Sequence, residues 1–220
     1  MREADNIRAV EALGVDWMGF IFWPESKRFC DRKPDYLPTR CKRVGVFVNA
    51  DVADVVRYAV EYGLNIVQLH GDENRQYIMQ MRQALAAAGV KCAVAKALAI
   101  KSAADIAQCE NYVGFVDYFL FDTPTAGRGG SGKSFDWKLL ADNYRLMTPF
   151  LLSGGIGPES ASAIKEFNHP CCEGIDLNSR FESAPGRKDV SKLREFIVET
   201  LSPALPLNGE GAGDTIGCNS

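Results

Sequence analysis

The stretch RVGVFVNADVADVVRYAVEYGLNIVQL, residues 43–69, places two apolar runs on either side of an amphipathic segment. Both runs are continuous rather than alternating, which is typical of strands that are buried on both faces, as in a parallel sheet. Between them, apolar residues from Val52 to Val60 recur at helical spacing, with Asn49-Ala50-Asp51 expected to cap the helix before them and Gly63 after them. The stretch therefore predicts a strand, a helix and a second, parallel strand.

The same alternation extends along the chain in both directions. Apolar runs of strand length begin near residues 17, 43, 66, 92, 116, 149 and 174, and helical segments lie between them. The chain of 220 residues opens on a helix, residues 4–13. A (β/α)8 TIM barrel has eight strands, begins on a strand and typically contains about 250 residues. We therefore expect an α/β fold of this kind that lacks its first β-strand, with an open doubly wound sheet as the alternative.

Composition limits the domain organisation and the class of partner. The barrel is expected to form a single domain over residues 1–202, and the Gly- and Ser-containing residues 203–220 predict a disordered tail. A formal charge of −3 gives no basic surface for nucleic acid, and no apolar run reaches the roughly 20 residues of a membrane span. Seven irregularly spaced cysteines and only two histidines indicate free thiols, no metal site and a cytoplasmic protein.

In such a barrel, functional side chains lie at the carboxyl ends of the strands. The polar residues expected there are Arg28, Asn49, His70, Asp72, Lys96, Asp122, Ser153, Gly154, Gly155, Asp176, Asn178 and Ser179. The last of these follow the final two strands, where barrels often bind phosphate through backbone N–H groups and a helix N-terminus. Glycines at positions 154 and 155 allow the backbone to approach a phosphate closely.

A competing motif occupies residues 127–134, which match the G-x-x-x-x-G-K-[ST] spacing of a nucleotide-binding P-loop. Such a loop follows its strand directly and opens a long helix. Here four residues separate the strand from the glycines, and the helix after them is short. The context disfavours ATP or GTP binding, which remains an alternative function.

Five motifs in register resemble the phosphoribosylanthranilate isomerase family of tryptophan biosynthesis. They are VGVFVN at residues 44–49, VQLHGD at 67–72, GGSGKSFDW at 129–137, SGG at 153–155 and ESAPG at 182–186. The resemblance covers about residues 1 to 200. It implies an Amadori rearrangement of N-(5-phosphoribosyl)anthranilate to 1-(2-carboxyphenylamino)-1-deoxyribulose 5-phosphate, without a cofactor or a metal.

The resemblance also assigns roles to individual residues. Asp122 matches the general acid that protonates the ring oxygen, and Arg28 matches the arginine that holds the anthranilate carboxylate through its planar fork. The phosphate is expected against Gly154, Gly155, Asn178 and Ser179. The other expected substrate-binding residues are His70, Gly130 and Asp176.

One family feature is missing from this sequence. The family's first strand carries a cysteine that acts as general base, whereas this chain begins at Met1-Arg2-Glu3, which matches the residues just after that motif. We therefore expect Met1 to be an internal methionine of a longer chain, and the chain as given to be impaired in catalysis. The alternative is a barrel, monomeric or homodimeric, that binds the phosphorylated ligand without turning it over.

Overall fold

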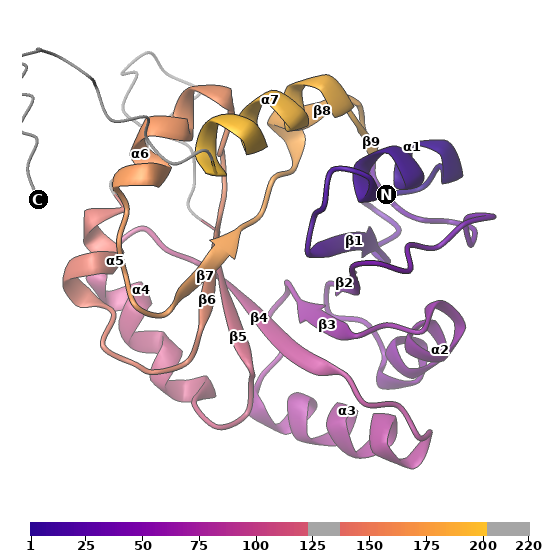
Figure 1. Cartoon of the computed structure of the whole chain (residues 1–220). Coiled ribbons are helices and arrows are strands. Elements are labelled where there is room, and N and C mark those ends of the chain that lie inside the picture. The colour runs from indigo at the N-terminus through magenta and orange to yellow at the C-terminus, as the bar shows by residue number, and fades with distance from the viewer. Residues whose placement is uncertain (123–136, 202–220) are drawn as a thin grey trace, which may run out of the picture.

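The computed structural model describes residues 1–122 and 137–201, and one sheet of seven parallel strands organises them (Figure 1). The strands are β1 (Trp17–Ile21), β2 (Lys42–Phe47), β3 (Ile66–Leu69), β4 (Ala93–Ala99), β5 (Tyr118–Asp122), β6 (Phe150–Ser153) and β7 (Cys172–Ile175). They pair in sequence order from β1 to β7. A doubly wound sheet reverses its strand order at a switch point, so the sequential order excludes that alternative and confirms the TIM-barrel prediction.

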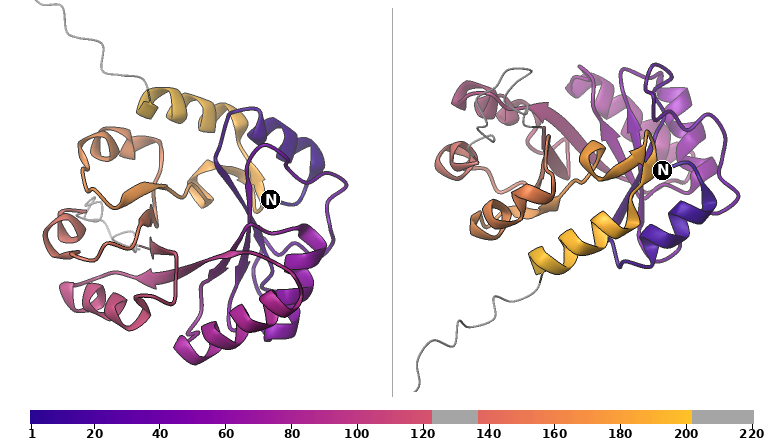
Figure 2. Two further views of the ribbon diagram at one scale, coloured as in Figure 1. Left: turned by 60° about the horizontal axis from the view of Figure 1, so that its bottom comes forward. Right: turned by 90° about the horizontal axis from the view of Figure 1, so that it is seen from above.

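Helices cover the outer face of the curved sheet (Figure 2). They are α1 (Ala4–Glu11), α2 (Val52–Tyr62), α3 (Arg75–Ala87), α4 (Ala103–Ala107), α5 (Lys138–Asn143), α6 (Ala161–Glu166) and α7 (Val190–Leu201). Short 3-10 turns add η1 (Gln108–Tyr112), η2 (Pro158–Ser160) and η3 (Ser179–Phe181). As predicted, α2 ends at Gly63, whose φ of 56° is readily adopted only by glycine.

The start of α2 differs from the sequence prediction. Its N-cap residue is Asp51, but the side chain of Asp51 makes no capping hydrogen bond. Asn49, expected as part of the cap, instead accepts a hydrogen bond from the backbone N–H of Asp72 at 2.8 Å. The polar residues after β2 therefore connect two strand-end loops instead of closing a helix end.

Apolar side chains fill two layers, one on each face of the sheet. Large aromatic residues such as Phe20, Phe119 and Phe150 are fully buried between the sheet and the helices. The buried residues of the inner layer form one cluster around Val44, Ile66 and Ala95 and another around Ala97, Leu120 and Leu151, with the partly buried Trp17 and Tyr118 packed against both. Burying each large apolar side chain stabilises the fold by about 1.5–3 kcal/mol. Several of these inner residues, among them Val44, Ala95 and Leu151, line a cavity inside the sheet.

Within the described residues the sheet does not close, because β1 pairs only with β2 and β7 only with β6. The N-terminal amine of Met1 donates a hydrogen bond to the carbonyl oxygen of Gly19 on the open side of β1, at 2.7 Å. On the outside, α1 packs against α7, and Figure 1 shows the two helices side by side. The gap between β1 and β7 agrees with the prediction that the first barrel strand is absent.

A small antiparallel hairpin, β8 (Glu182–Ala184) and β9 (Arg187–Lys188), follows β7 and was not predicted from the sequence. It is fastened to α1 by the buried side chain of Asn6, which donates to the carbonyl oxygen of Lys188 and accepts from its N–H group. The hairpin lies beside the open edge of the sheet, where it brings Glu182 and Lys188 to the cavity.

Three predictions concern residues outside the part that the structure describes: the P-loop-like residues 127–134, Gly130 as a substrate contact, and the tail 203–220. In the described part, none of the helices is both long enough and apolar enough to cross a membrane.

Candidate active site

The carboxyl ends of the strands open into a cavity of about 1380 Å³. The predicted site residues that line it are Arg28, His70, Asp122, Ser153, Gly154, Gly155, Asp176, Asn178 and Ser179. The cavity also runs along the gap between β1 and β7, where α7 contributes Leu193 and Phe196. Side chains from distant parts of the chain therefore meet in one site, as the parallel arrangement predicts.

Asp122, the last residue of β5, lies next to His70 in the lining of the cavity. The Nε2 atom of His70 lies 3.7 Å from Oδ2 of Asp122, and both side chains are partly exposed, at 34% and 43%. On the other side of the imidazole ring, Nδ1 is 2.9 Å from Nε2 of Gln68, two residues earlier on β3. Gln68 therefore fixes the orientation of His70 and was not identified from the sequence. The alternation of side chains along a strand could have indicated it, because residues 68 and 70 point to the same face.

The ends of β6 and β7 form the side of the cavity expected to bind phosphate. Ser153 donates a hydrogen bond from Oγ to Oδ2 of Asp176 at 3.0 Å, which fixes the two strand ends relative to each other. Gly154 and Gly155 have φ angles of 86° and 61°, a conformation that residues with a Cβ atom rarely adopt. The backbone after β6 therefore turns sharply at a place where only glycine fits without strain.

Arg180, whose contribution to this region the sequence left open, is engaged elsewhere. Its guanidinium forms an ion pair with Glu159 of η2 at 2.9 Å, and both side chains are about half exposed. Asn178 remains on the cavity side, and its Oδ1 accepts a hydrogen bond from the ammonium group of Lys188 at 3.0 Å. Asn178 and Arg180 therefore have different surroundings although they are two residues apart.

Arg28 lines the cavity as predicted, but it is not a free cation. Its Nε donates to both carboxylate oxygens of Glu182, at 3.0 and 2.8 Å, and its Nη2 lies 2.7 Å from Oε2. Glu182 is also 3.5 Å from the ammonium group of Lys188. Burial alone would raise the pKa of Glu182, but the hydrogen bond from Arg28 and the charge of Lys188 hold it below its usual value.

Lys188 is the second charged residue that sequence reasoning missed. Its ammonium group donates to the carbonyl oxygen of Leu177 and to the side chain of Asn178, both at 3.0 Å. Burial lowers the pKa of Lys188, and the nearby carboxylates of Glu182 and Asp176 oppose this shift. Glu182 lies 154 residues from Arg28 along the chain. Without the position of the hairpin, these charges could not be connected from the sequence.

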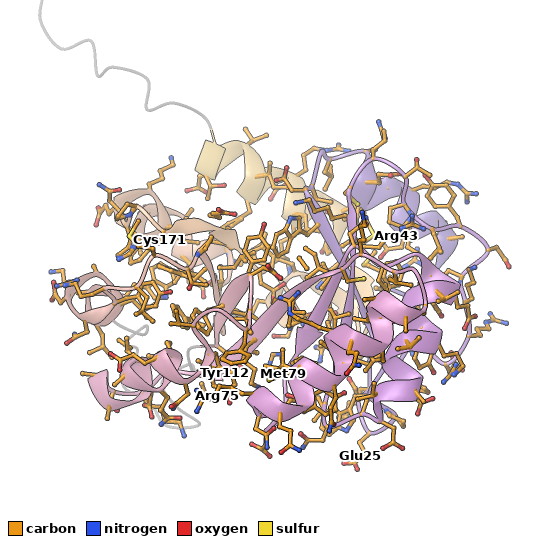
Figure 3. All side chains as sticks on the ribbon, turned by 90° about the horizontal axis from the view of Figure 1, so that it is seen from below. Glu25, Arg43, Arg75, Met79, Tyr112 and Cys171 are labelled. Atoms are coloured by element: carbon orange, nitrogen blue, oxygen red, sulfur yellow. The ribbon has the colours of Figure 1, made fainter. Side chains whose placement is uncertain are left out.

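Lys96, expected among the strand-end residues, does not line the cavity. Its side chain points to the outer face of the sheet, where it is 1% exposed and lies 3.1 Å from Glu73. The ammonium group is 5.9 Å from the centre of the ring of Tyr112, which is labelled in Figure 3. Lys96 is preceded and followed by alanines, so hydropathy alone did not show which face it occupies.

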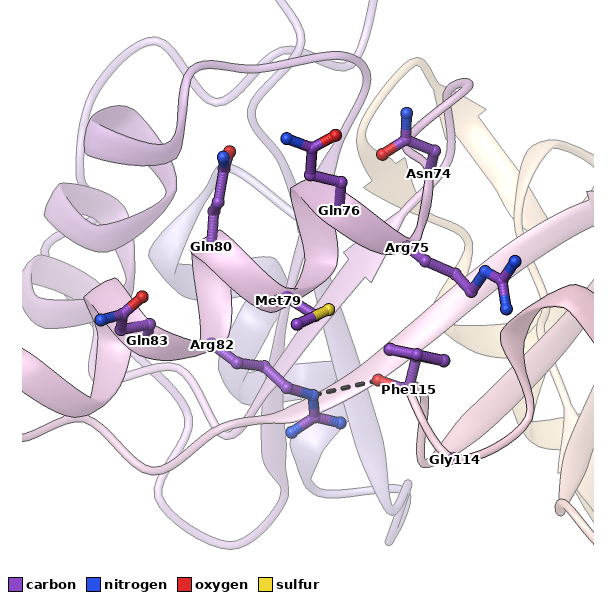
Figure 4. A pocket seen from close by; sticks show the side chains of 9 residues that line it. All are labelled: Asn74, Arg75, Gln76, Met79, Gln80, Arg82, Gln83, Gly114 and Phe115. Carbon is purple, nitrogen blue, oxygen red and sulfur yellow. Dashed lines mark hydrogen bonds between the residues drawn. The ribbon is translucent and has the colours of Figure 1, made fainter.

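A second hollow of about 970 Å³ lies outside the barrel, between α3 and the loop after η1 (Figure 4). Arg82 closes one side of it by donating from Nε to the carbonyl oxygen of Phe115 at 3.0 Å. Its lining consists of amide, arginine and apolar groups and the Gly114 backbone, without a carboxylate or a histidine. Of the two hollows, only the inner cavity is therefore lined by carboxylate and imidazole groups in the described part of the chain.

Cysteines of the described region do not supply a base near Asp122. Cys41 lines the cavity, but it precedes β2 and so lies at the opposite end of the strands from Asp122. Burial raises the pKa of the Cys41 thiol to about 11, so it is protonated near neutral pH. Cys30 is fully buried and its Sγ donates to the carbonyl oxygen of Arg32 at 3.3 Å. Residues 1–122 and 137–201 also hold no group of three His, Cys, Asp or Glu side chains arranged to bind a metal ion.

Seven parallel strands, helices on the outer face and a polar cavity at the carboxyl strand ends place the chain in the class of (β/α)8-barrel proteins. Residues 1–199 match the family model described as N-(5'-phosphoribosyl)anthranilate isomerase, and the chain belongs to this family.

Sequence relatives and solved structures agree with this membership. The N-(5'-phosphoribosyl)anthranilate isomerase of Phocaeicola vulgatus is 47% identical over 197 residues, covering 90% of this chain and 93% of the relative. That of Parabacteroides distasonis is 47% identical over 213 residues, covering 93% and 92%. The crystal structure of the Thermotoga maritima enzyme superposes with a TM-score of 0.72 at 31% identity, covering 91% of this chain and 95% of that one. A second structure, in complex with reduced 1-(o-carboxyphenylamino)-1-deoxyribulose 5-phosphate, gives a TM-score of 0.70 at 28% identity and covers 91% and 98%.

Proposed function

We propose that this chain forms the active-site scaffold of a phosphoribosylanthranilate isomerase of tryptophan biosynthesis. The reaction is the intramolecular conversion of N-(5-phosphoribosyl)anthranilate to 1-(2-carboxyphenylamino)-1-deoxyribulose 5-phosphate. The observation that carries this proposal is a single cavity that holds Asp122, an arginine and the glycine turn after β6, in a chain of this family. The substrate has an ionised carboxylate at one end and a phosphate at the other, so it needs cationic or N–H groups at both ends of its site.

Asp122 is the general acid in this proposal. It ends β5 at the mouth of the cavity, where its carboxyl group can reach a bound sugar ring, and proton transfer from such a group accelerates reactions by about 10²–10⁴-fold. His70 lies against the same carboxyl group and lines the substrate pocket. Arg28 binds the anthranilate carboxylate.

The phosphate binds on the opposite side, against Gly154, Gly155, Asn178 and Ser179. The positive φ angles of the two glycines support this placement, because a backbone without side chains lets N–H groups approach an anion. Asp176 and Gly130 complete the proposed substrate contacts. Asp176 is fixed by Ser153, whereas Gly130 lies outside the described residues.

The general base is proposed to come from a first strand that precedes Met1 and fills the place between β1 and β7. Two observations support this: the described sheet is open at that place, and Cys41 and Cys30 are unsuited to the role. The proposal also includes action as a cytoplasmic monomer or homodimer that binds no nucleic acid. One related solved structure is that of monomers generated from the dimeric Thermotoga maritima enzyme.

The experiment compares this chain with a form extended by an upstream strand that carries a cysteine. Loss of substrate fluorescence follows turnover, and calorimetry with reduced 1-(o-carboxyphenylamino)-1-deoxyribulose 5-phosphate follows binding. We expect turnover by the extended form, and binding with little turnover by the chain as given. Replacing Asp122 with Asn in the extended form should reduce turnover by about 10²–10⁴-fold. Absence of ligand binding by both forms would overturn the function, and full turnover by the shorter chain would overturn the assignment of the base.

A further inference from the structure

We propose that Glu182 is a positioning residue of this site. It holds one edge of the Arg28 guanidinium, so that the other edge stays directed at the carboxylate of the ligand. This inference rests on the proposed function and names the group that makes Arg28 a specific carboxylate receptor.

Arg28 needs such a partner because of where it lies in the chain. It belongs to the connection between β1 and β2, residues 22–41, and its side chain has several rotatable bonds. Near Arg28 the backbone is fixed by a bridge between Ile21 and Phe29 and by a hydrogen bond from the N–H of Cys30 to Ile21. These contacts do not fix the guanidinium, and ordering a long side chain costs conformational entropy. Glu182 holds the side chain of Arg28 in one conformation before the ligand binds.

Glu182 is itself held in place by the hairpin. Its side chain is 5% exposed, and Oε1 accepts a hydrogen bond from the N–H of Gly186 at 3.2 Å. The hairpin is anchored to α1 by two hydrogen bonds between Asn6 and Lys188, at 2.9 and 2.8 Å. The carboxylate therefore has a fixed position relative to the barrel, and its hydrogen bonds with Arg28 hold the guanidinium in place.

The geometry leaves part of the guanidinium for a ligand. Glu182 contacts Nε and Nη2, and within the described residues Nη1 forms no hydrogen bond or ion pair. An arginine side chain carries five N–H donors in one plane, so one edge can bind Glu182 while the Nη1–Nη2 edge binds a second carboxylate. The side chain is 27% exposed and lines the cavity, so this edge is within reach of a ligand.

The charges allow a second anion to bind there. Glu182 is the only carboxylate that contacts Arg28 in the described structure, and it is shared with Lys188. Asp176 also lies near Lys188 and balances its charge, so the part of the guanidinium that Glu182 does not contact is what remains for a second anion. Lys188 also donates to Asn178, so the same carboxylate is connected to the loop proposed to bind phosphate. That second connection is weaker, because the Lys188–Glu182 distance is 3.5 Å and Lys188 keeps two other acceptors.

The test measures the binding of two ligands to the full chain and to its Glu182→Gln variant. The first ligand is reduced 1-(o-carboxyphenylamino)-1-deoxyribulose 5-phosphate, and the second is the same compound without the aryl carboxyl group. Gln keeps the size of the side chain but turns an N–H group toward the donors of Arg28. We expect about 10- to 100-fold weaker binding of the carboxylated ligand, and a change of less than about 3-fold for the other.

Glu3→Gln is the matched control, because Glu3 pairs with Arg187 of the same hairpin at an exposed site. It should change neither affinity. If Glu182→Gln does not fold, Glu182→Asp takes its place, because the shorter side chain can reach only part of the Arg28 edge. We then expect an intermediate loss of affinity for the carboxylated ligand, again with little change for the other ligand. Equal losses for both ligands, or no loss for the carboxylated one, would overturn the positioning role. Failure of the unchanged protein to bind either ligand would instead count against the proposed function.

Discussion

Two pairs of opposite charge, one buried and one partly buried, lie near the carboxyl ends of the strands, on opposite faces of the sheet. On the outer face, the side chains of Lys96 and Glu73 are each 1% exposed. On the inner face, the side chain of Glu182 is 5% exposed and that of Arg28 is 27% exposed. The two pairs are similar in chemistry but differ in what their donors face.

The outer pair is satisfied by the protein itself. Lys96 donates to the carbonyl oxygen of Gly71 at 2.5 Å as well as to Glu73, and Glu73 accepts from the N–H groups of Asn49 and Gly71. The inner pair keeps donor capacity on Arg28 toward the cavity. Burial of a charge is therefore not what distinguishes a functional group here. What distinguishes the inner pair is that donors of Arg28 are held in place and are still directed at the cavity.

The largest expected effect on stability comes from breaking the outer pair with Lys96→Met. The substitution leaves the carboxylate of Glu73 buried without a cation, which costs about 3–5 kcal/mol in comparable cases. Urea unfolding followed by circular dichroism measures the loss. Lys165→Met, at an exposed position of α6, is the control and should change the free energy of unfolding by less than about 0.5 kcal/mol.

A second substitution tests whether charge is the cause. Adding Glu73→Gln to Lys96→Met removes the unpaired buried charge, so the double variant should be more stable than Lys96→Met alone. The ligand affinity of the folded protein should change little, because neither side chain lines the cavity. A Lys96→Met variant within about 1 kcal/mol of the unchanged protein would contradict the structural role of this pair.

Gly71→Ala is expected to have the next largest effect on stability. The added methyl group would clash with Asn49, whose N–H group is hydrogen-bonded to Glu73 of the outer pair. A Cβ atom at position 71 would lie 2.4 Å from Oδ1 and 2.9 Å from the backbone nitrogen of Asn49. Backbone must then move, which typically costs about 1–3 kcal/mol. In the control Gly174→Ala, the nearest atom is 3.9 Å away, so little change in unfolding free energy is expected. If both variants were equally stable, the close approach of Asn49 to Gly71 would have no energetic consequence.

The inner pair should also affect how stability depends on pH. The pKa of Glu182 is lower in the folded protein than its ordinary value of 4.5, so the folded state favours the ionised form. Its contribution to stability is therefore complete above about pH 5 and is lost as the pH falls through the folded pKa. Urea midpoints measured between pH 3 and pH 6 should fall less steeply toward low pH in Glu182→Gln than in the unchanged protein. An unchanged slope would indicate that Arg28 does not stabilise the ionised carboxylate.

The sequence predicted the parts of this molecule that depend on local patterns. Continuous apolar runs such as residues 66–69 identified the strands, and Gly63 identified the end of α2. Strand order then gave the place of Asp122 and of the glycines after β6, because parallel strands end at the same edge of a sheet. The motif at residues 182–186 was recognised as part of a family pattern, although its hairpin structure was not.

The contacts that local patterns could not predict are those between distant residues. Glu182 reaches Arg28 only because the hairpin is fastened to α1, a relation that no periodicity in either segment records. Lys96 lies on a strand that is buried on both faces, and such a strand has no polar alternation to show its orientation. In both cases the charge was visible in the sequence, and the partner that determines its role was not.

The smallest effect is expected for an exposed pair, Arg180–Glu159, which completes the comparison of charge pairs. Its side chains are 46% and 59% exposed, so Glu159→Gln should cost at most about 1 kcal/mol, and less at high salt. The substitution releases the guanidinium of Arg180 two residues from Asn178, and this makes it informative about the ligand. If Arg180 does not contact the phosphate, the affinity for reduced 1-(o-carboxyphenylamino)-1-deoxyribulose 5-phosphate should stay within about 2-fold, in contrast to Glu182→Gln. A tenfold tighter complex measured by calorimetry would instead show that the released arginine binds the phosphate, and that Glu159 normally keeps it away.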